Sequence, residues 1–270
     1  MITKIALTLM LLLSHIAVGA TLPRLAPGEY YNNEQRWQAQ EDQRNPPPAL
    51  SLDVMQTTQT SYTLHVKEGN NAEAYTLNIS SKDKATLSGT TGTCELDITD
   101  NRAGTDIWVA EFDPTPCAWK LGPEHSSTKW IVGDRLFLSG NAADTTLAED
   151  YFGRSTGVAL RQAYHYSGWF VTDPAQSIHA TTREEAQFVR GLELHTEGDR
   201  QELFRKDGTS TGIEVELAAL TYQGTGAQIL KLALYRVGES RAFTYIWSEN
   251  GADRIGINLR WLQVGLTRQD

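Results

Sequence analysis

Histidine is the side chain in this sequence best suited to acid–base or metal chemistry. Beyond residue 20 the chain has five, at His65, His125, His165, His179 and His195. They are scattered and show neither HxH nor HExxH spacing, so a zinc site would need ligands from distant segments. We therefore predict no metal site.

A second candidate for ligand chemistry is a run of alternating polar side chains near residue 195. Glu193, His195 and Glu197 fall on one face of a predicted strand, a face that suits a metal or a sugar. Such a row of charged residues is also typical of a solvated strand face. We expect the solvated face.

Two segments match GxSxG, the pattern of a nucleophile elbow, at Ser155 and Ser210. An elbow follows an apolar strand and precedes a helix, whereas charged residues precede both serines and strand-like alternation follows them. We interpret both as glycine-rich hairpin turns. Among 33 acidic residues no carboxylate pair stands out either, so the catalytic residues remain unknown.

Aromatic residues are plentiful, with seven tryptophans and a cluster toward the end of the first half. Tyr164 and Tyr166 share one face of a predicted strand there, and His165 points to the other. An aromatic lining with a few polar groups suits a ligand cleft, and it equally suits an ordinary β core. Both interpretations stay open at this point.

Alternating apolar and polar residues recur from residue 50 to the C-terminus and predict antiparallel strands. Turn signals such as Lys206-Asp207-Gly208 and Glu249-Asn250-Gly251 separate them. Two short helices are predicted, one over residues 32–43, ended by three prolines, and one over 181–189. We therefore expect an all-β fold, with one domain over residues 21–172 and a second antiparallel β unit over 173–270.

The first twenty residues have the features of a signal peptide. A charged start at Lys4 precedes an apolar run over residues 5–18, which is too short to span a bilayer, and small residues precede a cut after Ala20. We expect a periplasmic or secreted protein that begins at Thr21 and is not an integral membrane protein. The formal net charge of −9 argues against nucleic acid as a partner, and protein partners remain unknown.

Two cysteines, Cys94 and Cys117, are the only ones in the chain. In an exported protein an even count favours a single disulfide, because the oxidising compartment preserves the bond. CxxC and CxxH spacings are absent, which makes metal binding by this pair the weaker alternative.

A short motif near the N-terminus carries a family resemblance. Gly28, Tyr30, Asn32 and Gln35 lie in Gly-Glu-Tyr-Tyr-Asn-Asn-Glu-Gln, and Gly92-Thr93-Cys94 is followed by Cys117. Over roughly residues 22–171 the chain thus resembles the CpcT/CpeT family of phycobiliprotein chromophore lyases.

This resemblance implies a calyx-like, lipocalin-like antiparallel β-barrel with a short N-terminal helix and a linear tetrapyrrole as ligand. The family's Tyr-Arg-x-Arg strand has its counterpart at Tyr62-Thr63-Leu64-His65, where both arginines are missing. We expect the fold without bilin-lyase activity. Asn32 and Gln35 are expected to tie the helix to the barrel through side-chain to backbone hydrogen bonds.

Three functional hypotheses follow. In the first, the barrel carries a small apolar or tetrapyrrole-like ligand, with no cofactor certain, and its candidate ligand-binding residues are Tyr62, His65, Tyr164, His165 and Trp169. In the second, which leaves enzymatic activity uncertain, a lyase-like or hydrolytic reaction uses His65 or His165 with an acid such as Asp97. In the third, the chain is a structural or envelope-interaction protein that works through its C-terminal sheet. An open cavity favours the first or second hypothesis and a filled barrel the third.

Overall fold

The computed structural model describes residues 22–101, 107–121, 128–133, 135–141, 157–172, 188–222 and 227–269, which form one short helix and a series of antiparallel strands. The first unit contains β1 (Gly28–Tyr31), α1 (Asn33–Glu41), β2 (Leu50–Gln56), β3 (Ser61–Glu68), β4 (Asn71–Ile79), β5 (Lys84–Ser88), β6 (Thr93–Asn101), β7 (Trp108–Phe112), β8 (Thr128–Gly133), β9 (Leu136–Asn141) and β10 (Val158–Gln162). The second contains β11 (His165–Thr172), β12 (Phe188–His195), β13 (Glu197–Phe204), β14 (Ser210–Tyr222), β15 (Ala227–Arg236), β16 (Thr244–Glu249), β17 (Arg254–Asn258) and β18 (Leu262–Arg268). The predicted all-β fold is confirmed.

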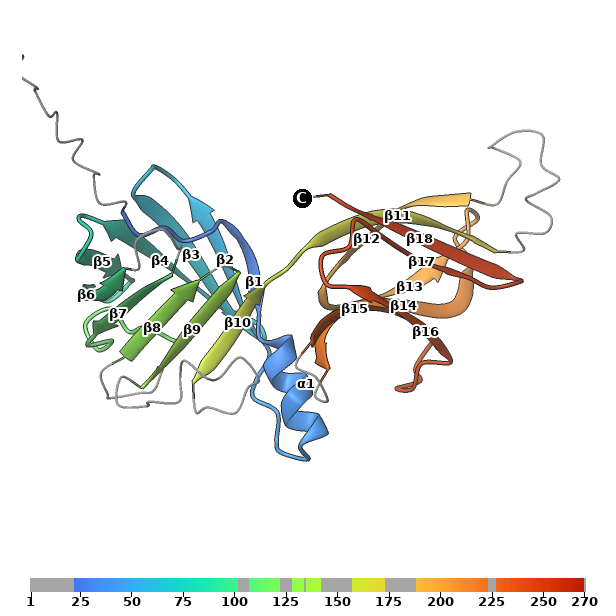
Figure 1. Ribbon diagram of the computed structural model, residues 1–270, viewed down its shortest axis with the longest axis horizontal. Coiled ribbons are helices and arrows are strands. Elements are labelled where there is room, and N and C mark those ends of the chain that lie inside the picture. The colour runs from blue at the N-terminus through green and yellow to red at the C-terminus, as the bar shows by residue number, and fades with distance from the viewer. Residues whose placement is uncertain are drawn as a thin grey trace, which may run out of the picture.

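The first unit is a closed barrel in which every neighbouring pair of strands is antiparallel (Figure 1). Strands β2 to β10 follow one another as a meander, and β1 closes the barrel between β2 and β10. Alternation sends every second side chain inward, as Tyr62, Leu64 and Val66 of β3 illustrate with their buried side chains. Closure leaves the barrel without an unpaired edge.

The second unit is a sandwich of two four-stranded sheets, ordered β12-β11-β18-β17 and β13-β14-β15-β16. Residues of both sheets share one core, including Tyr166 and Val264 of the first sheet and Leu217 and Leu232 of the second. The chain passes between the sheets at Thr196, the single residue that separates β12 from β13. Figure 1 shows this unit beside the barrel, with α1 below the point where β10 leads into β11.

Strand β11 lies in a different unit from the one expected. Residues 165–172 were placed in the first domain, but β11 pairs with β18 and β12 of the sandwich. The barrel ends at Gln162, and only Ala163 and Tyr164 separate β10 from β11. Of the second predicted helix, residues 181–187 lie outside the described ranges, and Phe188 and Val189 belong to β12.

Helix α1 lies within the predicted range and is mostly polar, with Trp37 as its one large apolar residue and with Glu34, Gln35 and Gln38 buried. In the described ranges, no helix is both long enough and apolar enough to cross a membrane. Asn32 precedes the helix, but its side chain does not cap it. Instead Asn32 Nδ2 donates to Pro48 O at 2.8 Å, and Asn32 Oδ1 accepts from Leu50 N at 2.9 Å.

Gln35 ties the other side of the helix to the barrel. Its Nε2 donates to Gly157 O at 2.6 Å, and its Oε1 accepts from Ala159 N at 3.3 Å, at the start of β10. Both amides therefore make the side-chain to backbone hydrogen bonds expected of them. Together they hold α1 between β2 and β10, the two strands that flank β1.

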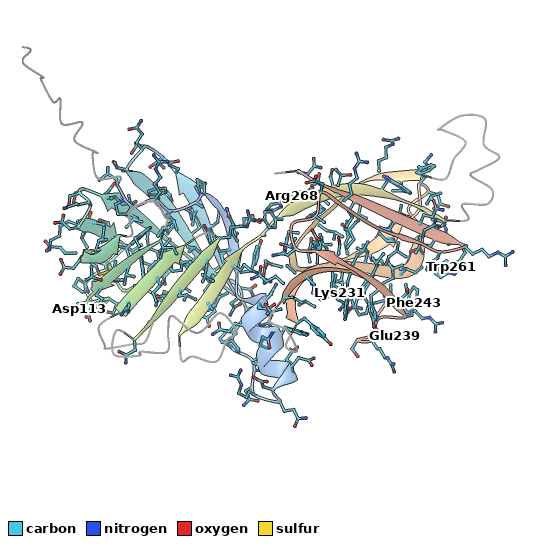
Figure 2. The ribbon with its side chains drawn as sticks, viewed as in Figure 1. Asp113, Lys231, Glu239, Phe243, Trp261 and Arg268 are labelled. Carbon is cyan, nitrogen blue, oxygen red and sulfur yellow. A yellow bond between two sulfur atoms is a disulfide. The ribbon has the colours of Figure 1, made fainter. Side chains whose placement is uncertain are left out.

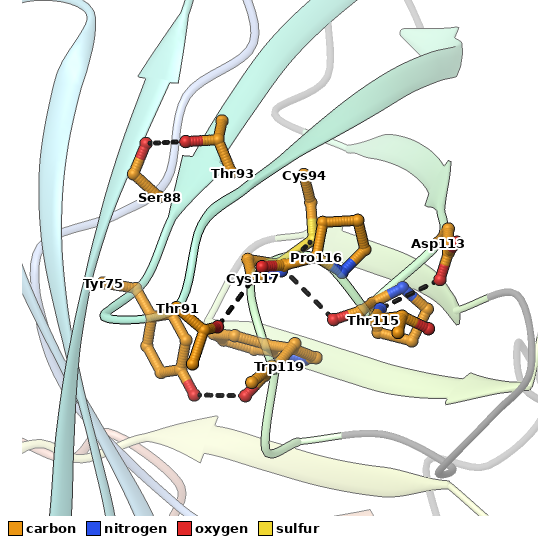
Figure 3. The surroundings of a disulfide bond; sticks show 12 residues. Tyr75, Ser88, Thr91, Thr93, Cys94, Asp113, Thr115, Pro116, Cys117 and Trp119 are labelled. Carbon is orange, nitrogen blue, oxygen red and sulfur yellow. Dashed lines mark hydrogen bonds between the residues drawn. A yellow bond between two sulfur atoms is a disulfide. The ribbon is translucent and has the colours of Figure 1, made fainter.

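The predicted disulfide is confirmed: Cys94 of β6 is bonded to Cys117, with 5.3 Å between their Cα atoms. Cys117 lies in the turn that follows β7, so the bond joins a strand to a loop (Figure 3). Tyr75 supports the same loop, because its hydroxyl donates to Ala118 O at 2.9 Å and its ring meets Trp119 edge-on at 4.8 Å. Trp119 then extends this loop into the barrel core.

Replacing both cysteines by alanine is expected to lower the free energy of unfolding by roughly 2 to 4 kcal/mol, because the disulfide limits the freedom of the unfolded chain. Urea unfolding monitored by tryptophan fluorescence measures the loss. The β-sheet circular dichroism should persist, because the barrel strands pair independently of the bond. Two free thiols in native, alkylated wild-type protein would contradict the prediction.

Candidate functional site

The barrel centre, where the first hypothesis places a ligand, is occupied by the protein's own aromatic rings. Trp130 is fully buried there. Its ring centroid lies within 4.9 to 6.3 Å of those of Trp119, Phe112, Phe137 and Trp108. These four neighbours are also buried. The interior that β strands enclose is therefore a packed core at this level.

The chain before β1 covers one end of this core. Leu25 is buried within it, and Trp108 Nε1 donates to Arg24 O at 2.7 Å. Beside this segment a cleft of about 570 Å³ remains, lined by Leu25 and Pro27 on one side and by Gln56 and Tyr62 on the other. Tyr62, a predicted ligand residue, therefore lies in the core and borders an opening at the barrel end.

The five predicted ligand residues do not share one cavity. Tyr62 points into the barrel, whereas His65, of opposite parity on the same strand, is half-buried on the outer side. The other three residues come after β10, the last barrel strand. Tyr164 immediately precedes β11, and β11 contains His165 and Trp169 and pairs with strands of the sandwich. The expected barrel cavity combined Tyr62 or Tyr164 with Trp169, and one of the two histidines as its polar contact. Of these residues only Tyr62 has its side chain inside the barrel.

Tyr164 and Trp169 have packing roles in the second unit. The guanidinium carbons of Arg135 and Arg268 lie 3.1 and 3.8 Å from the centroid of the Tyr164 ring. Trp169 covers Gly265 of β18, where an added Cβ would meet its ring at 2.9 Å. Trp169 therefore packs within the sandwich, whereas Tyr164 lies at the junction of the two units, where it lines a cavity of about 180 Å³.

A histidine pair lies where the two units meet. His165 Nε2 is 3.7 Å from Glu29 Oε2, beyond hydrogen-bond length, and both side chains are about half exposed. The His195 ring lies 6.1 Å from that of His165 and stacks on Tyr31 at 4.7 Å. Asp97, the acid considered with these histidines, instead pairs with Lys84 on the barrel surface.

No group of three or more His, Cys, Asp or Glu side chains suited to a metal ion occurs in the described parts of the chain. His125, His179, Ser155, Ala20 and the rest of the predicted signal peptide lie outside those parts. Ser210 begins β14 after a turn with Gly208 at φ 81°, which agrees with a hairpin turn.

The expectation of a solvated face at Glu193, His195 and Glu197 is wrong for Glu197. Glu193 is exposed and His195 half-buried, but Glu197 is only 1% exposed. The strand ends at His195, and the sheet changes at Thr196, so the alternation does not continue to Glu197. Glu197 instead enters the contact between the two units.

At this contact Glu197 pairs with Arg161 of β10. Arg161 Nε donates to Glu197 Oε1 at 2.7 Å, and Arg161 Nη2 lies 3.5 Å from Glu34 Oε2 of α1. Desolvation raises the pKa of Glu197 from 4.5 to about 7, which the nearby Arg161 charge only partly offsets. A polar cavity of about 180 Å³ adjoins the pair.

The largest exposed aromatic grouping lies on the outer face of the β13–β16 sheet. Tyr222, Tyr245 and Trp247 are 48%, 58% and 50% exposed. With Trp37 of α1 they line a groove of about 490 Å³, called here the aromatic groove. Its other lining residues are Glu41, Leu220, Thr221, Ile229, Lys231, Tyr235, Ser240, Arg241 and Ala242.

Strand register explains why these side chains meet. Lys231 of β15 pairs with Trp247 of β16, and Ile229 pairs with Leu220 of β14, so their side chains share the face opposite the sandwich core. The Tyr245 and Trp247 rings lie 5.6 Å apart at an interplanar angle of 23°, and the Tyr222 ring lies 5.9 Å from that of Trp247 at 53°.

This groove was not predicted from the sequence. The spacing of Phe243, Tyr245 and Trp247 is typical of the buried face of a half-buried strand, whereas all three are exposed. A usable signal was Tyr245-Ile246-Trp247, three consecutive large apolar residues, which places apolar groups on both faces of β16. Trp37 could not be associated with them, because α1 is more than two hundred residues away in sequence.

Comparison with known proteins returned no relative: no family model, curated protein or solved structure matches this chain. The CpcT/CpeT relationship therefore stays a prediction from the motif.

Glu197 should make stability depend on pH. Its raised pKa means that the folded state retains a proton that the unfolded state loses, so this contribution is full below about pH 4.5 and is lost as pH rises through about 7. Between pH 5 and pH 8 wild type should lose roughly 2 to 3 kcal/mol that Glu197→Gln does not lose. Urea unfolding at both pH values measures it.

The control for this experiment is Glu193→Gln, which changes an exposed carboxyl group two residues from His195. It should keep the wild-type pH dependence. Burial lowers the pKa of His195. Titration of His195 therefore makes stability increase as pH rises, and it does so equally in wild type, Glu197→Gln and Glu193→Gln. The same pH dependence in wild type and Glu197→Gln would contradict the assignment, whatever the variant's overall stability.

Proposed function

We propose that this chain is an exported binding protein that works through the aromatic groove, with the barrel as its rigid support. The proposal is closest to the third hypothesis, because packed tryptophans occupy the barrel centre. The contrast within one molecule carries it: Trp130 is fully buried, while Tyr222, Tyr245 and Trp247 are about half exposed along one groove. Exposed apolar patches of this kind mark binding sites in soluble proteins.

Export is supported by the buried disulfide, since such bonds persist in oxidising compartments. The predicted signal peptide supplies the route. Binding, and not catalysis, is favoured by the groove's composition: its titratable side chains, which are Glu41, Lys231, Arg241 and the tyrosines Tyr222, Tyr235 and Tyr245, include no histidine or cysteine.

A second candidate function keeps the small apolar or tetrapyrrole-like ligand that the family resemblance implies. The cleft at Tyr62 favours it, with about 570 Å³ at the barrel end. A tetrapyrrole at the barrel centre would have to displace the rings around Trp130. In this version the ligand therefore lies at the opening, against Leu25 and Tyr62.

Nile red, a neutral apolar dye, tests which opening binds ligands. We expect saturable fluorescence enhancement with wild type, weakened roughly tenfold in Trp247→Ala, because the lost ring contributes most of the apolar contact. Trp261→Ala is the matched control: Trp261 is 47% exposed and lies at the end of the unit far from the barrel, beside Phe243 (Figure 2).

Dye binding that survives Trp247→Ala and is displaced by biliverdin would move the site to the barrel end and support the second candidate. Absence of saturable dye binding to wild type would contradict both. Circular dichroism and thermal unfolding verify that the variants fold, as expected for side chains that are half exposed.

A further inference from the structure

We infer that the occupant of the aromatic groove is a neutral carbohydrate chain, an inference that rests on the proposed function of this groove. Three features of the groove carry it: exposed, stacked aromatic rings, a rim of both hydrogen-bond donors and acceptors, and nearly balanced charge.

The aromatic part of the groove is a stack of exposed rings. The Tyr245 and Trp247 rings are stacked, 23° from parallel with 5.6 Å between their centroids, and the Tyr222 ring lies 5.9 Å from that of Trp247 at 53°. All three residues are about half exposed, so ring surface remains open to a ligand. A sugar ring has an apolar face of C–H groups, and the negative face of an aromatic ring attracts these weakly positive groups.

The rim suits hydroxyl groups, which donate and accept hydrogen bonds alike. Lys231 and Arg241 supply donors, Glu41 of α1 supplies acceptors, and Ser240 supplies both. They surround the rings from a helix, a strand and a turn, so a ligand that reaches them lies across the sheet face.

Charge favours a neutral ligand. Lys231 Nζ lies 3.5 Å from Glu216 Oε2, which leaves Glu41 and Arg241 as one acid and one base at the rim. The whole chain has a formal net charge of −9, which disfavours polyanions. Neither a nucleic acid nor a sulfated or acidic polymer matches this surface.

An extended peptide is the competing occupant. Strand β16 ends its sheet and pairs only with β15 among the described strands, so a peptide could add to its free edge through backbone hydrogen bonds. That mode uses the strand edge and leaves the rings and rim on the sheet face unused. The placement of Trp37 and Glu41 over that face therefore favours the carbohydrate.

The test is isothermal titration of the full-length mature protein with cellohexaose, laminarihexaose, chitohexaose and maltohexaose, with dextran sulfate as the charged comparison. At least one neutral oligosaccharide should bind saturably and displace Nile red. Trp247→Ala should weaken that binding roughly tenfold, Trp247→Phe should weaken it less, and Trp261→Ala should leave it within twofold. Dextran sulfate should not bind more tightly than the neutral chains.

Failure of this inference is distinguishable from failure of the proposed function. If Nile red binds in a Trp247-dependent way but none of the four oligosaccharides does, the carbohydrate assignment is wrong and the groove remains a binding site. If dextran sulfate binds most tightly, the assignment to a neutral chain is wrong. Capture of an extended peptide that persists in Trp247→Ala, together with no sugar binding, would replace the carbohydrate by strand addition to β16.

Discussion

The buried ion pair between Arg161 and Glu197 determines how the two β units of this protein meet. Taking both charges out of water is costly, and the cost is recovered only when the remaining hydrogen-bonding capacity finds partners. Arg161 contacts Glu197, Glu34 and Ala219 O, which belong to β13, α1 and β14. A shifted junction would leave these charges buried without partners, so the pair permits few relative placements of the units.

The aromatic groove depends on that junction. Glu34 Oε1 accepts from Thr221 N at 3.1 Å, and Gln38 Nε2 approaches Thr221 O at 3.4 Å, which docks α1 on β14. The same helix carries Trp37 and Glu41 to the groove. Asn32 and Gln35 tie α1 to the barrel. The barrel therefore supports the aromatic groove by holding α1 in place, and its strands do not themselves line the groove. The proposed binding groove therefore depends on the barrel through α1, even though aromatic rings pack the barrel centre.

Fold class, the disulfide and the first helix could be predicted because local pattern and compartment determine them. Strand pairing could not: alternation at residues 165–172 specifies a half-buried strand but does not say that its partner is β18 and not a barrel strand. The burial of Glu197 was equally hidden, since an acid in a polar run predicts a solvated face until its partner Arg161 is known. The groove was lost for the same reason, because Trp37 and Trp247 meet only after both units have folded.

The exposed rings of β16 are costly in water. An edge strand with apolar groups on both faces invites pairing with other chains, and β16 carries Tyr245, Ile246 and Trp247 in succession. The chain can bury such residues, since the barrel encloses four aromatic side chains around Trp130. Trp261 and Phe243 form a smaller exposed pair of stacked rings, and scattered exposed apolar residues are ordinary on a protein surface. Several rings that line one groove, on a face held open by α1, are what a binding surface requires.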